Sequence, residues 1–169
     1  MYNKLVLIIL LTLSLGCGYT LLDKSSVYSE NGTLSVIGKR VFVYPFKSKV
    51  KEPLVEVIFT NKLIESFMKS GIILSSPEDA DYIVNGEISG YSLSTMAMSK
   101  TGEIGVYRLR VTVNVAIRDR EGKVIFNRSF ADYEDYPVET TIEFTKSRER
   151  EAQAKISERI AQLLVLFLK

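Results

Sequence analysis

The sequence lacks most of the residues that enzymes use for catalysis. It has no histidine and a single cysteine, Cys17, so it offers no imidazole base, no histidine-activated nucleophile and no His/Cys metal cluster. Paired carboxylates can also act as acid and base, and Asp132, Glu134 and Asp135 lie close together in the chain. They stand at the predicted end of a strand, where a solvated cluster is the more common arrangement. We predict no catalytic residue, metal site or cofactor; a hydrolase built on Asp132 and Asp135 is the remaining enzymatic alternative.

Cys17 follows a segment with the layout of an export signal. Lys4 precedes an apolar run from Leu5 to Leu13, and small residues lead up to the cysteine. The run of about nine residues is shorter than the roughly 17 to 25 that a membrane-spanning helix needs. A buried core helix is the alternative, but the run has no polar stripe. We predict that residues 1–16 are a signal peptide.

The residues before the cysteine, S-L-G-C from Ser14 to Cys17, resemble the lipobox of bacterial lipoproteins. The resemblance implies cleavage just before Cys17 and acylation of the new N-terminus, including an amide-linked chain such as palmitate. Several acyl chains, at roughly 0.8 kcal/mol per buried methylene, make a lasting membrane anchor. The alternative is a lone buried thiol. The next residue is Gly18 and not Asp, which in enterobacterial lipoproteins implies transport onward to the outer membrane.

The composition predicts one folded domain behind this anchor. Apolar residues make up 46% and aromatic residues 10% of the 169-residue chain, which is typical of a globular protein. The 22 basic and 20 acidic residues nearly balance, so no strong field favours a nucleic-acid partner. A single cysteine allows no internal disulfide, so the core alone must hold the fold. We predict a lipidated tether over residues 17–38 and one domain over residues 39–169.

Alternating apolar and polar residues predict the strands that position the polar side chains. The clearest alternation runs from Tyr107 to Asp119 and places aliphatic residues on one face, with Arg108, Arg110 and Arg118 on the other. A bulge is expected near Gly90, and a hairpin tip at Ser99 to Glu103. The predicted strands are Arg40 to Phe46, Tyr82 to about Met98, Tyr107 to Asp119, and one that begins at Val124.

Two segments have helical periodicity. Pro53 is expected in the first turn of a helix that runs to about Ser70 and stops at Gly71. The second helix follows Pro137, with Thr140 and Glu143 as a capping box. Its charged stretch from Lys146 to Glu151 is expected to be a solvated face. The predicted apolar faces are Val57, Phe59, Leu63, Ile64, Phe67 and Met68 in the first helix and Ile156, Ile160, Leu163, Leu164 and Phe167 in the second.

The order strand, helix, three strands, helix predicts an α+β fold. We expect a mainly antiparallel sheet of about four strands with two helices packed on one face, in the order β-α-β-β-β-α. The other sheet face is polar and can lie against water or a partner.

The chain after the signal resembles the LptE family, the lipopolysaccharide-assembly lipoproteins that plug the LptD β-barrel. The resemblance depends on the order of several motifs more than on any one of them. These are C-G-Y at Cys17 to Tyr19, A-D-Y-I-V-N-G-E-I at Ala80 to Ile88, K-T-G-E followed by Y-R-L-R-V-T-V-N-V up to Val115, and S-E-R-I-A-Q-L-L at Ser157 to Leu164.

The resemblance implies a non-enzymatic protein that is lipid-anchored in the outer membrane, faces the periplasm, assists folding of the barrel and helps deliver lipopolysaccharide to the outer leaflet. By position, Lys100 and Lys146 match cationic residues that the family links to lipopolysaccharide. Arg108 and Arg110 flank the hairpin tip, where guanidinium groups suit phosphates. Ordinary solvated charges are the alternative for all four. The alternative function is a periplasm-facing adaptor or activator of an envelope enzyme or secretion complex.

Overall fold

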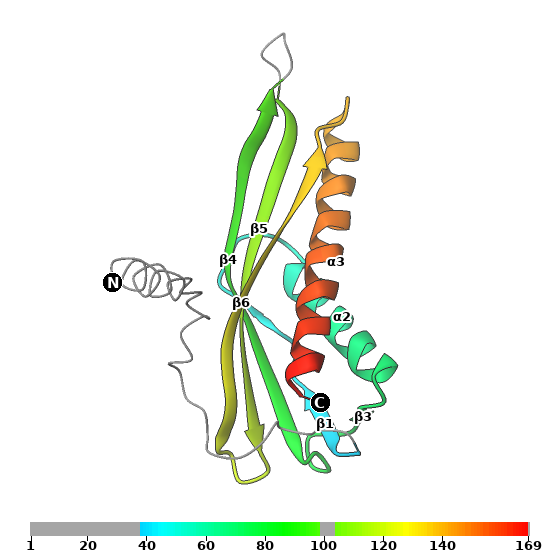
Figure 1. Cartoon of the computed structure of the whole chain (residues 1–169), viewed down its shortest axis with the longest axis vertical. Helices are drawn as coiled ribbons and strands as arrows, with labels where there is room; N and C mark the ends of the chain where they lie inside the picture. The colour runs from blue at the N-terminus through cyan, green and yellow to red at the C-terminus, as the bar shows by residue number, and fades with distance from the viewer. Residues whose placement is uncertain (1–37, 99–103, 169) are drawn as a thin grey trace, which may run out of the picture. The chain divides into compact units, whose positions relative to one another are not determined.

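The computed structural model describes residues 38–98 and 104–168, which form a six-stranded mixed sheet and two helices (Figure 1). The sheet order is β3-β1-β4-β5-β6, and β2 pairs with β4 off this path. This confirms the α+β class and the antiparallel meander β4-β5-β6, whereas the strand count is higher than the predicted four because short parallel strands extend the sheet. The strands are β1 (Arg40–Val43), β2 (Lys47–Ser48), β3 (Ile73–Leu74), β4 (Tyr82–Met98), β5 (Ile104–Asp119) and β6 (Val124–Pro137).

The strands of the meander are long because their alternation is nearly unbroken. β5 buries every second residue from Leu109 to Ile117 against the helices. The predicted bulge is confirmed by a register shift between Ile88 and Gly90. Gly86 is required for a different reason, because a Cβ there would lie 2.2 Å from the ring of Phe46.

Helix α2 (Val55–Lys69) begins two residues after Pro53, which therefore precedes the first turn instead of lying in it. Its end agrees with the prediction: Gly71 has φ 76°, and the N–H of Ile72 donates to Phe67 O. Phe59, Leu63 and Phe67 are buried as predicted and Ile64 packs against the core, but Val57 and Met68 are exposed.

Helix α3 (Ile142–Phe167) is capped by Thr141, whose side chain accepts from Phe144 N, and not by the predicted Thr140–Glu143 box. Its buried stripe extends from Glu149 through Ile156, Ile160 and Leu164 to Leu168. Leu163 and Phe167, which were predicted in the apolar face, are exposed. Phe167 instead packs beside the ring of Phe126 at the edge of the sheet.

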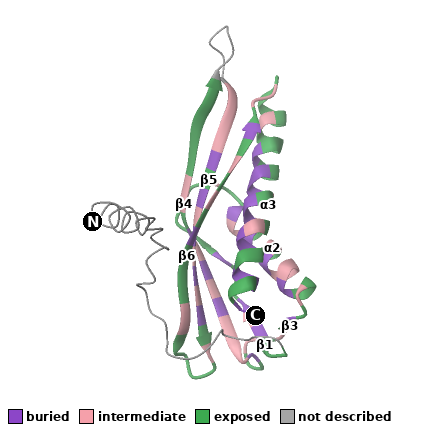
Figure 2. Ribbon diagram, viewed as in Figure 1, coloured by how far each residue is buried: buried purple, intermediate pink, exposed green. Residues whose placement is uncertain are grey.

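Both helices cover the same face of the sheet, and the core lies between these two layers (Figures 1 and 2). Neither helix in the described part of the chain is long and apolar enough to cross a membrane. The opposite face of β5 carries Arg108, Arg110, Thr112, Asn114 and Arg118, which are exposed or half-buried. The arginine-bearing polar face that the sequence predicts is therefore present.

Candidate functional site

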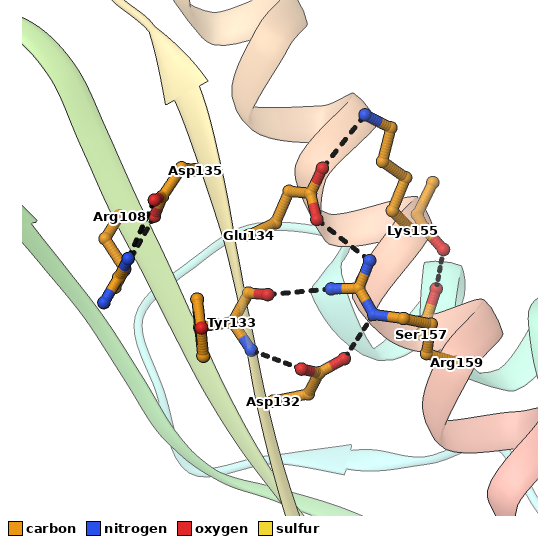
Figure 3. A network of polar contacts seen from close by, with 9 residues as sticks. Arg108, Asp132, Tyr133, Glu134, Asp135, Lys155, Ser157 and Arg159 are labelled. Atoms are coloured by element: carbon orange, nitrogen blue, oxygen red, sulfur yellow. Dashed lines mark hydrogen bonds and ion pairs between the residues drawn. The ribbon is translucent and has the colours of Figure 1, made fainter.

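The polar face of the sheet holds an arginine paired with a carboxylate on the neighbouring strand. Arg108 on β5 donates from Nε and from an Nη to the two oxygens of Asp135 on β6, at 2.7 and 2.8 Å (Figure 3). The guanidinium also lies 4.2 Å from the centre of the Tyr133 ring. The hydrogen bond from Arg108 holds the pKa of Asp135 below its ordinary value. The charge of Arg108 is thus neutralised within the domain.

Arg110 lies on the same face and is less occupied. It is exposed, its guanidinium lies 5.9 Å from the Tyr133 ring, and it pairs in register with Ser92 of β4. It forms no salt bridge with another residue of the ranges 38–98 and 104–168. Of the two arginines predicted to bind phosphate, Arg110 is therefore the one without an ion-pair partner among the described residues.

Lys146 lies on α3, on the other side of the sheet. Its Nζ donates to Glu149 Oε2 at 2.9 Å, and this hydrogen bond raises the pKa of the lysine. The lysine side chain is 52% exposed, whereas Glu149 is almost completely buried. Its ammonium group can reach solvent, but it also compensates a buried carboxylate, so its removal is expected to affect stability as well as binding.

Glu149 belongs to a buried polar cluster that the sequence did not predict. The hydroxyl of Tyr91 on β4 donates to Glu149, and Gln153 Nε2 donates to the same hydroxyl at 2.8 Å. Burial and the carboxylate together raise the pKa of Tyr91, which keeps the phenol neutral. Glu149 is 3% and Gln153 2% exposed. The spacing of Glu149, Gln153 and Ile156 along one helical face is the signal that could have found the cluster.

The structure does not bring the four predicted cations into one site. Arg108 and Arg110 lie on the polar face of the sheet, and Lys146 lies on the face that the helices cover. Lys100 and Cys17 are outside the described residues. A single phosphate group therefore cannot contact both Lys146 and the arginines of the polar face.

The carboxylates considered for catalysis are separated by the strand that carries them. Asp132 and Glu134 point toward α3, where Arg159 contacts both at 2.6 and 2.9 Å and also donates to Tyr133 O (Figure 3). Asp135 points to the opposite face. Burial alone would raise the pKa of Glu134, but hydrogen bonds from Lys155 and Arg159 lower it. These carboxylates hold α3 on the sheet edge, and Asp132 and Asp135 do not share a cleft.

The described residues offer little enclosed space for a ligand. A pocket of about 110 Å³ lies between the end of β6 and α3, lined by residues such as Tyr136, Arg148 and Lys155. Pockets that enclose small molecules are usually about 300 to 1,000 Å³. No group of three or more potential metal ligands occurs within residues 38–98 and 104–168.

Several solved structures share the fold. A minor lipoprotein from Acinetobacter baumannii is 20% identical, with a TM-score of 0.52 over 76% of this chain and 89% of that chain. A putative lipoprotein from Caulobacter crescentus is 11% identical, with a TM-score of 0.54 over 73% of this chain and 87% of that one. PelC from Paraburkholderia phytofirmans is 13% identical, with a TM-score of 0.52 over 83% and 96%. At these identities the likeness establishes the fold alone.

The sequence itself identifies the family. A search of the curated proteins gave no match. The family model described as LptE, lipopolysaccharide-assembly, matches residues 38–168. The match includes both helices, all six strands and the segments that carry the motifs from Ala80 onward. The chain therefore belongs to the LptE lipopolysaccharide-assembly family.

Proposed function

We propose that this protein is an outer-membrane lipoprotein that plugs an LptD-type β-barrel, assists its assembly and helps deliver lipopolysaccharide to the outer leaflet. The observation that carries the proposal is the LptE family match over residues 38–168. The export signal and the lipobox that ends at Cys17 are consistent with a lipid anchor on the periplasmic side. The proposed role is non-enzymatic, as is that of the LptE family.

The polar face of the sheet supports the plug. Large membrane barrels have polar interiors, so the surface of a plug that contacts the barrel wall must present hydrogen-bonding side chains. Hydroxyls and amides line this face, among them Ser92, Thr112, Asn114 and Ser129, and Arg108 and Asp135 compensate each other. Such a surface can lie against a wet wall without burying an unpaired charge.

Lipopolysaccharide contact is proposed to depend on the cations near the β4–β5 hairpin. Lipid A phosphates prefer guanidinium and ammonium groups. Arg110 and Arg118 on the polar face can both bind a phosphate without losing an internal ion pair, and Arg110 is the one nearer the β4–β5 end of the strand. Lys100 and Lys146 are the further candidates, and Arg108 contributes once Asp135 releases it. In this mechanism the cations loosen aggregated lipopolysaccharide by competing for its phosphates.

The plug is tested by isolating the full-length protein from its native envelope in mild detergent and identifying bound proteins by mass spectrometry. A large outer-membrane barrel in about equal amount is the expected result. Recovery of a soluble periplasmic enzyme instead would move the protein to the adaptor class.

Lipopolysaccharide binding is tested with charge reversals on the purified protein. Arg110→Glu is expected to weaken binding of purified lipopolysaccharide, because the phosphates then meet a carboxylate. Lys123→Glu is the matched control, since this exposed residue lies in the turn at the other end of β5. Lys146→Gln is preferable to Lys146→Glu, which would place a second carboxylate beside buried Glu149. Equal binding by all three variants would remove these cations from the mechanism.

A further inference from the structure

β4 has strand neighbours on both sides along only part of its length. β1 pairs with residues Tyr82 to Val84, and β2 pairs with Glu87 and Ile88. Beyond Ile88, β5 is the neighbour of β4 within the described residues. In Figure 1 this upper part of β4 stands beside β5, and none of the described elements lies along its other edge.

An uncovered edge presents unpaired backbone N–H and C=O groups, and proteins usually protect it with charges, proline or bulges. The other edge of the sheet follows this rule, because β6 carries Arg128, three carboxylates and Pro137. The uncovered stretch of β4, S-G-Y-S-L-S-T-M-A-M from Ser89 to Met98, contains no charged residue and no proline. Neither charged side chains nor proline therefore protect this edge of β4.

Bulges bound the usable part of the edge. The β4–β5 register shifts between Ile88 and Gly90 and again between Thr95 and Ala97. Between these shifts, Tyr91 to Thr95 pair regularly with β5. The regular stretch matches the length of a common strand, about five to six residues. Residues 92–97 are exposed, and Figure 2 shows this part of β4 as exposed.

The two faces of this stretch specify different neighbours. Leu93 lies on the helix-covered face, opposite buried Leu109, yet it is itself 46% exposed. Ser92 and Ser94 lie on the polar face, opposite Arg110 and Arg108. An added strand would lie about 4.8 Å from β4 and roughly twice as far from β5, so the long Arg110 side chain would contact it by extending across Ser92. A complementary segment therefore has apolar residues toward Leu93 and acidic or hydroxyl residues toward Arg110.

We infer that Tyr91 to Thr95 bind one extended segment of a separate partner polypeptide by strand addition, with apolar residues alternating with acidic ones. The identification of this partner as the barrel protein rests on the proposed function. A second copy of the chain is disfavoured, because five paired residues bury far less than the roughly 1,200 to 2,000 Å² of a stable interface. A partner already held at other contacts supplies its segment at high effective concentration.

The test is photo-cross-linking of the full-length protein in its native envelope. A benzophenone amino acid replaces Leu93, Ser94 or Thr95 in turn, and the cross-linked peptides are sequenced. Strand addition predicts cross-links to one segment of another polypeptide, with the sites from Leu93 and Thr95 two residues apart. Cross-links to residues 17–37 of the same chain, to a second copy, to scattered segments or to nothing would overturn the inference.

A charge variant provides an independent readout. Ser92→Lys with Ser94→Lys places two charges on the proposed edge, and Asn127→Lys with Ser129→Lys places the same charges on the same face of β6. We expect recovery of the partner to fall about tenfold for the β4 variant and to stay unchanged for the β6 variant. Thermal unfolding of both variants shows whether each is folded. Equal recovery by two folded variants would contradict the inference.

The outcomes separate this inference from the proposed function. If a barrel protein is recovered but the β4 cross-links are scattered, the function stands and the strand addition fails. If the cross-links define one segment of a soluble protein, the edge binds a strand and the barrel assignment fails.

Discussion

Replacing Tyr91 by phenylalanine tests whether the buried cluster holds α3 on the sheet. The change removes one hydroxyl, which donates to Glu149 and accepts from Gln153. A hydrogen bond to a charged group contributes about 1.5 to 3 kcal/mol, and a neutral one about 0.5 to 1.5. Glu149 keeps its contact with Lys146, so the losses overlap. We expect the free energy of unfolding to fall by about 2 to 4 kcal/mol.

Urea unfolding of the protein without its signal peptide measures this loss. Tyr133→Phe is the matched control, because Tyr133 is exposed and its hydroxyl has no hydrogen bond to another described residue. The control should stay within about 0.5 kcal/mol of the parent. A double-mutant cycle with Glu149→Gln isolates the coupling between the two side chains. A loss below about 0.5 kcal/mol for Tyr91→Phe would refute the idea that the cluster stabilises the fold.

Three further predictions concern other parts of the chain. The hydrogen bond from Arg108 lowers the pKa of Asp135 in the folded state. The contribution of this pair to stability is therefore complete above the ordinary carboxyl pKa of about 4 and is lost as the pH falls through the depressed value. In urea unfolding, the free energy of unfolding of Asp135→Asn should fall less on acidification than that of the parent. Gly86→Ala should cost about 1 to 3 kcal/mol in urea unfolding because its Cβ meets the buried Phe46 ring, and a neutral result would show that the ring moves aside. Cys17→Ala should abolish acylation, measured by mass spectrometry of the N-terminal peptide, and should release the protein from membranes; retention would contradict the anchor.

The alternation of β5 predicted its buried face correctly because each apolar residue there packs against the same helical layer. The short strands could not be predicted in the same way. β2 and β3 have two residues each, which is too short for any period, and they exist because β4 and β1 offer unpaired backbone groups beside them. Two residues carry only an intrinsic strand propensity, so pairing with a neighbouring strand determines whether they form a strand at all.

The site was predictable in its residue types and not in its geometry. The sequence placed Arg108 and Arg110 on one polar face, and the structure agrees. It also assigned the stretch from Lys146 to Glu151 to solvent, whereas Glu149 is buried. Opposite charges three and four residues apart are normally solvated, and a tyrosine on a strand 58 residues away changes this for one carboxylate.

Tyr91 belongs both to the buried cluster with Glu149 and Gln153 and to the stretch of β4 with the unpaired edge, so the cluster also affects that edge. Tyr91 is the first residue of the regular stretch beyond the bulge near Gly90. Beyond Ile88, the described elements that contact β4 at this level are β5 and, through the Tyr91 hydroxyl, α3. Glu149 and Gln153 fix the Tyr91 hydroxyl from α3, and this contact orients the strand at the point where the free edge begins. The alternating apolar residues already specify the register of β4 where its face is buried, and these directional hydrogen bonds add to that specification at the start of the exposed stretch.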